Sequence, residues 1–179
     1  MSEFSKKVLS IIMSLLFVVS MVFVGREAAK STTGGGIAEK SGYRVVIDAG
    51  HGGDDPGKVG VGNVLEKDIN LEIALILKKY LEADGVEVVM TREDSEGLYD
   101  ETATNKKVQD MKRRIEIIDE TAPDLAVSIH QNSYPEEYVH GAQVFYYTGS
   151  KPGEQLAELI QAQLIEKVDT ENRRVIKAN

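Results

Sequence analysis

Three side chains of the types that bind zinc lie beside apolar segments that are far apart in the chain. His51 follows the run VVIDAG, Glu66 lies within GNVLEKDIN, and His130 follows LAVSI. Two histidines and one carboxylate leave one position of a tetrahedral zinc ion open for water, which is the arrangement of a catalytic site. Zinc-bound water is a strong nucleophile near neutral pH, so these residues predict metal-assisted hydrolysis.

Each of the three residues also has a common alternative role. His51 lies in the segment GHGGDDPG, which has the composition of a solvated turn or of a glycine-rich nest for an anion. Glu66 follows Asn63 by three residues, which is the spacing of a capping box at the start of a helix. His130 is equally compatible with a partly buried histidine that bonds to the backbone. The zinc hypothesis therefore rests on the coincidence of all three positions.

The segments around these residues alternate between strand and helix patterns. Short apolar runs, typical of strands in a buried sheet, occupy Tyr43–Asp48, Val86–Met90, Leu125–Ile129 and Ala142–Tyr147. Apolar residues at helical spacing predict helices over 65–80, 108–118 and 156–168. We therefore expect an α/β fold, a single domain with a mostly parallel twisted sheet and helices on both faces.

The expected sheet brings the three candidate ligands to one edge. Ligands of open α/β sheets bind beyond the carboxyl ends of the strands. His51 follows the first strand and His130 follows the third. Glu66 opens the first helix, whose N-terminus faces the same edge. We therefore expect the three side chains to converge there.

The first 42 residues differ in character from the rest of the chain. Lys6 and Lys7 precede the segment 8–24, which is apolar apart from its serines. This pattern predicts a signal peptide or membrane anchor over residues 1–24. A small, polar and glycine-rich linker then covers 25–42, and 43–179 forms the catalytic domain. We therefore expect export to the outer face of the cytoplasmic membrane.

Composition limits the chemistry and the partners. The 179-residue chain contains no cysteine and has a formal net charge of −8. A metal must therefore be bound by histidine and carboxylate groups, and a nucleic-acid-binding surface is disfavoured.

The blocks IDAGHGG, EKDINL, TRED and SIHQN together resemble the zinc-dependent N-acetylmuramoyl-L-alanine amidases of bacterial cell walls. The N-terminal anchor and compact body further resemble the sporulation branch of that family, the CwlD type. The resemblance implies that His51, Glu66 and His130 bind one Zn²⁺ per chain. It implies peptidoglycan as the substrate, a place in the cell wall or spore cortex space, and an activating protein partner. Arg114 and Asn132 are the candidate substrate-binding residues.

The chain departs from the family pattern near its C-terminal end. Family members carry a catalytic glutamate on a late strand, followed by a closing helix, whereas this chain ends at RRVIKAN. We therefore expect a C-terminally truncated form, whose general base would lie beyond Asn179. Loss of such a group costs about 10²–10⁴-fold in rate. The alternative hypothesis is a non-catalytic protein that binds zinc and either peptidoglycan or a partner.

Overall fold

The computed structural model describes residues 42–133, 136 and 138–179. The segment 1–24, predicted as signal or anchor, lies outside the described residues, as does the linker 25–42 except for Gly42. Within the described part of the chain, no helix has the length and apolar character needed to cross a membrane. The described residues divide into two compact units, the first ending at Gln131 and the second beginning at Asn132.

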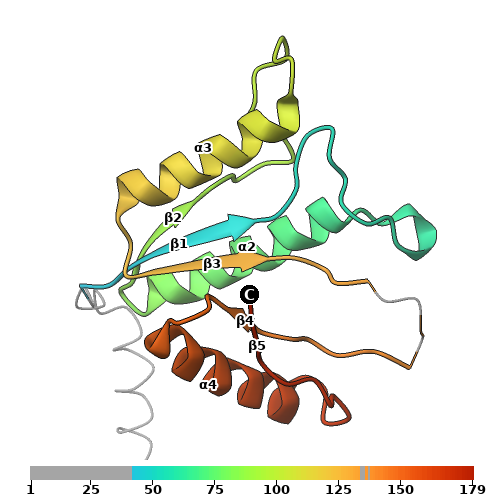
Figure 1. The fold of residues 1–179 in the computed structure, drawn as a ribbon, viewed down its shortest axis with the longest axis vertical. Coiled ribbons are helices and arrows are strands. Elements are labelled where there is room, and N and C mark those ends of the chain that lie inside the picture. The colour runs from blue at the N-terminus through green and yellow to red at the C-terminus, as the bar shows by residue number, and fades with distance from the viewer. Residues whose placement is uncertain (1–41, 134–135, 137) are drawn as a thin grey trace, which may run out of the picture. The chain divides into compact units, whose positions relative to one another are not determined.

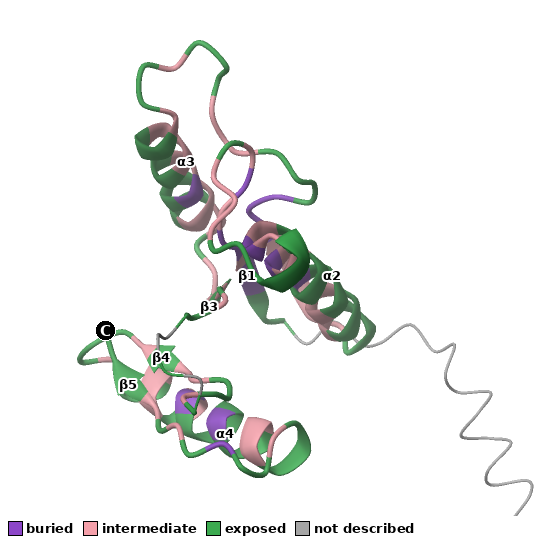
Figure 2. Cartoon of the chain, turned by 90° about the vertical axis from the view of Figure 1, so that its right-hand side faces the viewer, coloured by how far each residue is buried: buried purple, intermediate pink, exposed green. Residues whose placement is uncertain are grey.

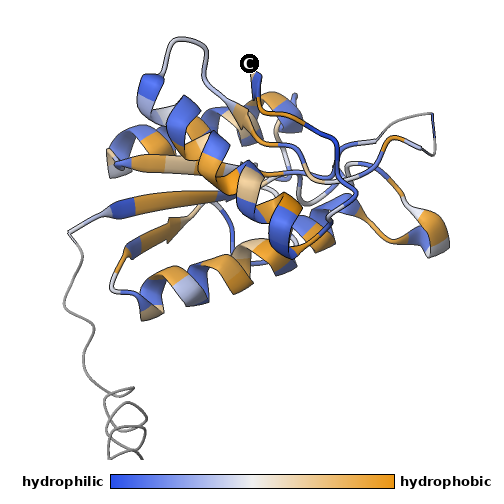
Figure 3. Ribbon diagram, turned by 90° about the horizontal axis from the view of Figure 1, so that it is seen from below, coloured by the Kyte–Doolittle hydropathy of each residue, from blue (hydrophilic) through white to orange (hydrophobic). Residues whose placement is uncertain are grey.

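A three-stranded parallel sheet forms the centre of the first unit (Figure 1). In spatial order its strands are β2 (Glu87–Met90), β1 (Arg44–Ala49) and β3 (Leu125–Ile129). Val45 of β1 pairs with Val88 on one side and with Leu125 on the other. The strands are mainly apolar (Figure 3), as expected of a sheet covered on both faces. The predicted parallel α/β sheet is confirmed.

Two helices cover opposite faces of this sheet: α2 (Glu66–Ala83) and α3 (Lys106–Thr121). Successive residues of a strand point to opposite faces. Ile47 of β1 belongs to the core cluster that includes Ala74 of α2, whereas the next residue, Asp48, bonds to Arg114 of α3. Within the first unit, many of the buried positions lie on β1 and on the side of α2 next to it (Figure 2).

The helix predicted over 65–80 is confirmed, but part of the apolar spacing that predicts it lies on a face that does not pack on the sheet. Ile73, Ile76 and Tyr80 are 42%, 51% and 70% exposed. The residues that pack on the sheet lie on the adjacent face of the helix: Leu71, Ala74, Leu77 and Leu81. Because α2 is apolar on both of these faces, spacing alone locates the helix and leaves its orientation undetermined.

The second unit contains one helix and two short parallel strands: β4 (Phe145–Tyr146), α4 (Lys151–Lys167) and β5 (Lys177–Ala178). The helix predicted over 156–168 is confirmed and begins earlier, because Ser150 caps its first turn by accepting a hydrogen bond from the amide of Gly153.

The strand predicted over Ala142–Tyr147 is shorter than expected. Gln161 of α4 bonds to the backbone of its first part, since its side chain donates to the carbonyl of Ala142 and accepts from the amide of Val144. These groups are then not available to a strand ladder. The strand therefore reduces to β4, which pairs with the unanticipated β5.

Candidate metal centre

His51 lies just beyond β1, at the carboxyl edge of the sheet. The amide of Gly50 still donates to the carbonyl of Ile129 at 3.0 Å, which extends the pairing of β1 with β3 up to the residue before the histidine. His51 itself has a φ of 64°, in the left-handed region that is uncommon for residues other than glycine. The chain therefore leaves the sheet sharply at this residue.

Glu66 is the first residue of α2, and its side chain is only 4% exposed. Its Oε2 accepts from the amide of Lys58 at 2.8 Å, and its Oε1 accepts from the amide of Gln131 at 2.9 Å. Burial by itself would raise the pKa of this carboxyl, but the two amides, with His130 and Asn70, outweigh it and lower the pKa to about 2. Glu66 is therefore negatively charged at neutral pH although little water reaches it.

His130 follows β3 directly, and its ring lies against Gly50. A Cβ atom at position 50 would come within 2.3 Å of two ring atoms of His130, so only glycine leaves room for the ring. The side chain of His130 is 51% exposed. This side of the cluster therefore opens to solvent.

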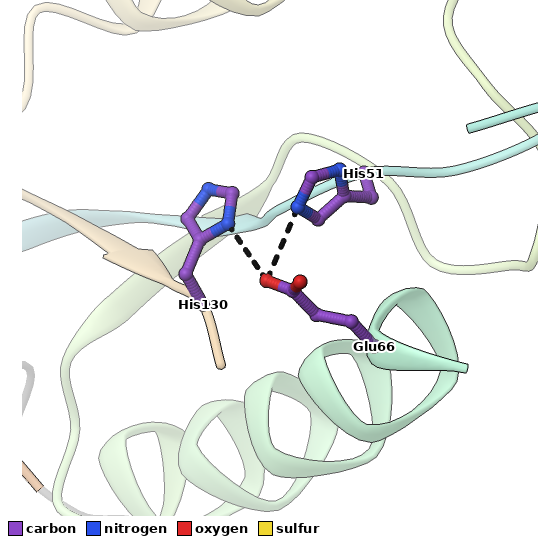
Figure 4. A group of neighbouring side chains, drawn as sticks. All are labelled: His51, Glu66 and His130. Carbon is purple, nitrogen blue, oxygen red and sulfur yellow. Dashed lines mark hydrogen bonds and ion pairs between the residues drawn. The ribbon is translucent and has the colours of Figure 1, made fainter. Parts of the chain in front are cut away.

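The three candidate ligands meet at the carboxyl edge of the sheet (Figure 4). Nε2 of His51 and Nδ1 of His130 each lie 3.1 Å from Oε1 of Glu66. One ligand atom from each residue falls within 4.8 Å of the others. Two ligand atoms at the usual ~2.0–2.1 Å from a tetrahedral zinc ion lie about 3.3 Å apart. The three side chains therefore converge at this edge, as expected, and the two nitrogen–oxygen distances of 3.1 Å are close to that spacing.

The imidazole of His51 lies between two carboxylates. Its Nδ1 is 3.0 Å from Oδ2 of Asp55, while its Nε2 faces Glu66. A neutral imidazole has one N–H, so when Nδ1 donates to Asp55 the lone pair of Nε2 points at a charged oxygen. A cation between these two electron-rich atoms would stabilise both. The donor set therefore fits a metal ion, and Asp55 is placed to orient a ligand, as carboxylates beside metal-bound histidines commonly do.

Asp55 is a supporting residue that the sequence pattern does not single out. The segment GHGGDDPG contains two adjacent aspartates that the sequence does not distinguish. The structure separates them, because Asp54 bonds to Lys106 of α3 while Asp55 bonds to His51. A histidine followed four residues later by a carboxylate in a turn was the available signal.

We expect Asp55→Ala to weaken zinc binding by about 10–100-fold, because the His51 ring would lose the partner that sets its orientation and its protonated nitrogen. Competition with a chromophoric chelator measures the affinity. Asp54→Ala is the matched control, since that neighbouring carboxylate bonds to Lys106 and not to a candidate ligand. Equal affinities for the two variants would contradict an orienting role for Asp55.

The capping-box alternative for Glu66 is wrong. Asn63 ends a short 3-10 helix, Val61–Asn63, and the residue directly before α2 is Leu65, which makes no side-chain cap. The carboxylate of Glu66 instead bonds to the amide of Lys58 and lies in the cluster.

The two candidate substrate-binding residues have different surroundings. The five N–H groups of Arg114 all bond inside the first unit, and the side chain is only 4% exposed. This placement does not support its predicted contact with substrate. Asn132 is exposed, and its Oδ1 accepts from the amide of Ser133. Its role in binding substrate stays a prediction.

Asp48 lies on β1, the strand that leads to His51, and its carboxylate accepts hydrogen bonds. Burial would raise its pKa, but hydrogen bonds and charge from Ser128, Arg114 and Thr91 outweigh burial and lower the pKa below the usual value of 3.8. A carboxylate with a depressed folded-state pKa stabilises the fold above its unfolded pKa, and this stability is lost as the pH falls through the folded-state value.

We therefore expect wild type and Asp48→Asn to differ in free energy of unfolding by a constant amount between about pH 7 and about pH 5. Below about pH 4 the difference should shrink, because the wild-type carboxylate then becomes protonated. Urea unfolding of both proteins across this range measures the difference. If the difference in free energy of unfolding disappeared entirely above pH 5, the lowered pKa of Asp48 would be contradicted.

Family comparison agrees with the geometry of the cluster. Residues 45–179 match the model of the N-acetylmuramoyl-L-alanine amidase family. The germination-specific N-acetylmuramoyl-L-alanine amidase of Bacillus subtilis is 37% identical over 137 residues, covering 75% of this chain and 57% of that protein. The chain thus spans little more than half the length of this curated relative.

Solved structures show the same likeness. The CwlD amidase from Clostridioides difficile, solved in complex with the GerS lipoprotein, matches with a TM-score of 0.73 and 37% identity, covering 76% of this chain and 72% of that one. The N-acetylmuramoyl-L-alanine amidase AmiC2 of Nostoc punctiforme matches with a TM-score of 0.60 and 33% identity, covering 78% and 71%.

Proposed function

Because the chain belongs to the N-acetylmuramoyl-L-alanine amidase family, we propose that it hydrolyses peptidoglycan at the amide between the lactyl group of N-acetylmuramic acid and L-alanine. The family match includes all three candidate ligands. The observation that carries the proposal is the position of His51, whose ring lies between Asp55 and Glu66 and turns a ring nitrogen toward a charged oxygen.

In this proposal His51, Glu66 and His130 would hold one zinc ion per chain. Imidazole and carboxylate ligands suit zinc, and three protein ligands leave a fourth position for water. Bound zinc supplies a water molecule with a pKa near 7 and polarises the carbonyl to be attacked.

The residues of the chain prepare the site in distinct ways. The amides of Lys58 and Gln131 hold the Glu66 carboxylate in one orientation. Asp55 is placed to hold the proton of His51 at Nδ1, which would direct the lone pair of Nε2 into the cluster. The exposed ring of His130 marks the open side, from which a peptidoglycan strand would approach.

Product analysis of purified peptidoglycan incubated with the full 179-residue chain tests the proposal. Cleavage at the proposed amide releases new α-amino groups of L-alanine and no new reducing sugar ends. We expect this release to stop when a chelator removes zinc and to return when zinc is restored. A chain that binds zinc and peptidoglycan but releases no amino groups would instead be the non-catalytic protein.

We also propose that the protein acts in the spore cortex, on the outer side of the cytoplasmic membrane. The support is the likeness to the germination-specific amidase and to the CwlD amidase. The substrate lies outside that membrane, and the predicted N-terminal segment would hold the protein there. Since the CwlD structure contains the GerS lipoprotein, we propose an activating lipoprotein partner. Its effect is measured as zinc-dependent release of amino groups with and without the partner.

A further inference from the structure

Two buried arginines, Arg92 and Arg114, surround the backbone that carries the candidate ligands. We propose that they are positioning residues, which place His51, Glu66 and His130 for zinc before the ion binds. The inference rests on the proposed function, because it takes these three residues as the zinc ligands.

Arg92 connects the segments of two ligands. It is 3% exposed, and its hydrogen bonds in the described part of the chain all go to backbone carbonyls. Its Nη2 donates to the carbonyl of Gly50 at 3.0 Å and to that of Lys67 at 2.8 Å. Gly50 precedes His51 and Lys67 follows Glu66 in the chain. This one nitrogen atom of Arg92 therefore ties the backbone beside His51 to the backbone beside Glu66 and sets the distance between them.

Arg114 connects the same loop to the strand of the third ligand. Its Nη2 donates to the carbonyl of His51 at 2.7 Å, and its Nη1 donates to Oδ1 of Asp48 at 2.6 Å. The other oxygen of Asp48 accepts from the hydroxyl of Ser128 on β3 at 2.6 Å. Ser128 lies two residues before His130. Arg114 therefore reaches His51 directly and His130 through this chain of bonds.

Together the two arginine side chains donate hydrogen bonds to three successive backbone carbonyls. The carbonyl of Ala49 accepts from both arginines, that of Gly50 from Arg92, and that of His51 from Arg114. His51 has a left-handed backbone, which a residue with a side chain keeps only when its surroundings hold it there. These buried donors supply that constraint.

The arrangement requires guanidinium groups. Among the described residues Arg92 forms no ion pair within 4.0 Å, and its guanidinium donates only to backbone carbonyls. Lysine has three donors on one nitrogen, whereas the planar guanidinium has five donors that point in different directions. Lysine at either position would keep the positive charge and lose several of the hydrogen bonds that the guanidinium donates.

The experiment compares Arg92→Lys and Arg114→Lys with Arg113→Lys in the full 179-residue chain. Arg113 is the matched control, because it is the neighbour of Arg114 on α3 and its guanidinium bonds to Asp100 away from the ligands. We expect zinc affinity, measured by chelator competition, to fall about 10–100-fold in the first two variants and to stay unchanged in the control. The visible absorption of the Co²⁺-substituted proteins should change in the same two variants, since it reports the geometry of the ligands.

The outcomes separate the inference from the proposed function. Wild type that binds zinc, with both lysine variants binding it equally well and with the same Co²⁺ spectrum, would overturn the positioning role alone. Wild type that binds no zinc would overturn the proposed function, and the positioning role with it.

A second measurement does not depend on how well the variants fold. Amide NMR spectra of wild type with and without zinc should show an ordered backbone over residues 49–53 in both states. Shifts should be confined to the surroundings of the three ligands. A segment that becomes ordered only when zinc is added would overturn the inference, because the positions would then come from the metal.

Discussion

Glu66→Ala should abolish stoichiometric zinc binding and, with it, amide hydrolysis. Glu66 supplies the only carboxylate of the ligand group, and its Oε1 lies 3.1 Å from a nitrogen of each histidine. The variant removes a ligand atom and the negative charge that offsets the charge of the ion. We expect zinc affinity to fall by more than the ~10–100-fold that loss of an outer partner causes.

Metal content after dialysis and chelator competition together measure this loss. Glu72→Ala is the matched control, because Glu72 is an exposed glutamate of the same helix and is not part of the cluster. Glu66→Ala also leaves the amides of Lys58 and Gln131 without their acceptor, so the unfolding midpoints of the metal-free proteins are compared as well. A folded variant that retains nearly one zinc per chain would refute the ligand assignment.

Gly50→Ala should cause a loss of zinc binding nearly as large, although position 50 supplies no ligand. The added Cβ would lie 2.3 Å from Cε1 and Nε2 of His130, closer than non-bonded carbon atoms approach. Either the ring of His130 rotates away or the backbone before His51 moves. Both movements separate ligand atoms that now lie within 4.8 Å of one another.

The matched control for this substitution is Gly60→Ala. Neither glycine has a positive φ, so the added methyl group and not the backbone is tested. At Gly60 the nearest atom to a new Cβ is the carbonyl oxygen of Val64 at 3.6 Å, an ordinary contact. We expect Gly60→Ala to bind zinc like wild type. Equal affinities for the two alanine variants would show that the ring of His130 can move without cost to the site.

The convergence of the candidate ligands could be predicted from the sequence because it follows from local rules. Apolar runs located β1 and β3, and parallel strands place their carboxyl ends at one edge of a sheet. His51 and His130 immediately follow those ends, and Glu66 opens the helix between them in the chain. Each step needs only a few neighbouring residues.

The tertiary structure alone decided which side chains support these ligands and which face of α2 is buried. Arg92 bonds to carbonyls up to 43 residues away, and Arg114 to carbonyls up to 65 residues away. Asp54 and Asp55 are equivalent in the sequence and differ only in what lies beside them in space. Periodicity reports how a segment folds on itself, whereas hydrogen-bond partners depend on where distant segments meet. For that reason the convergence of the three candidate ligands could be predicted from the sequence, and the residues that support them could not.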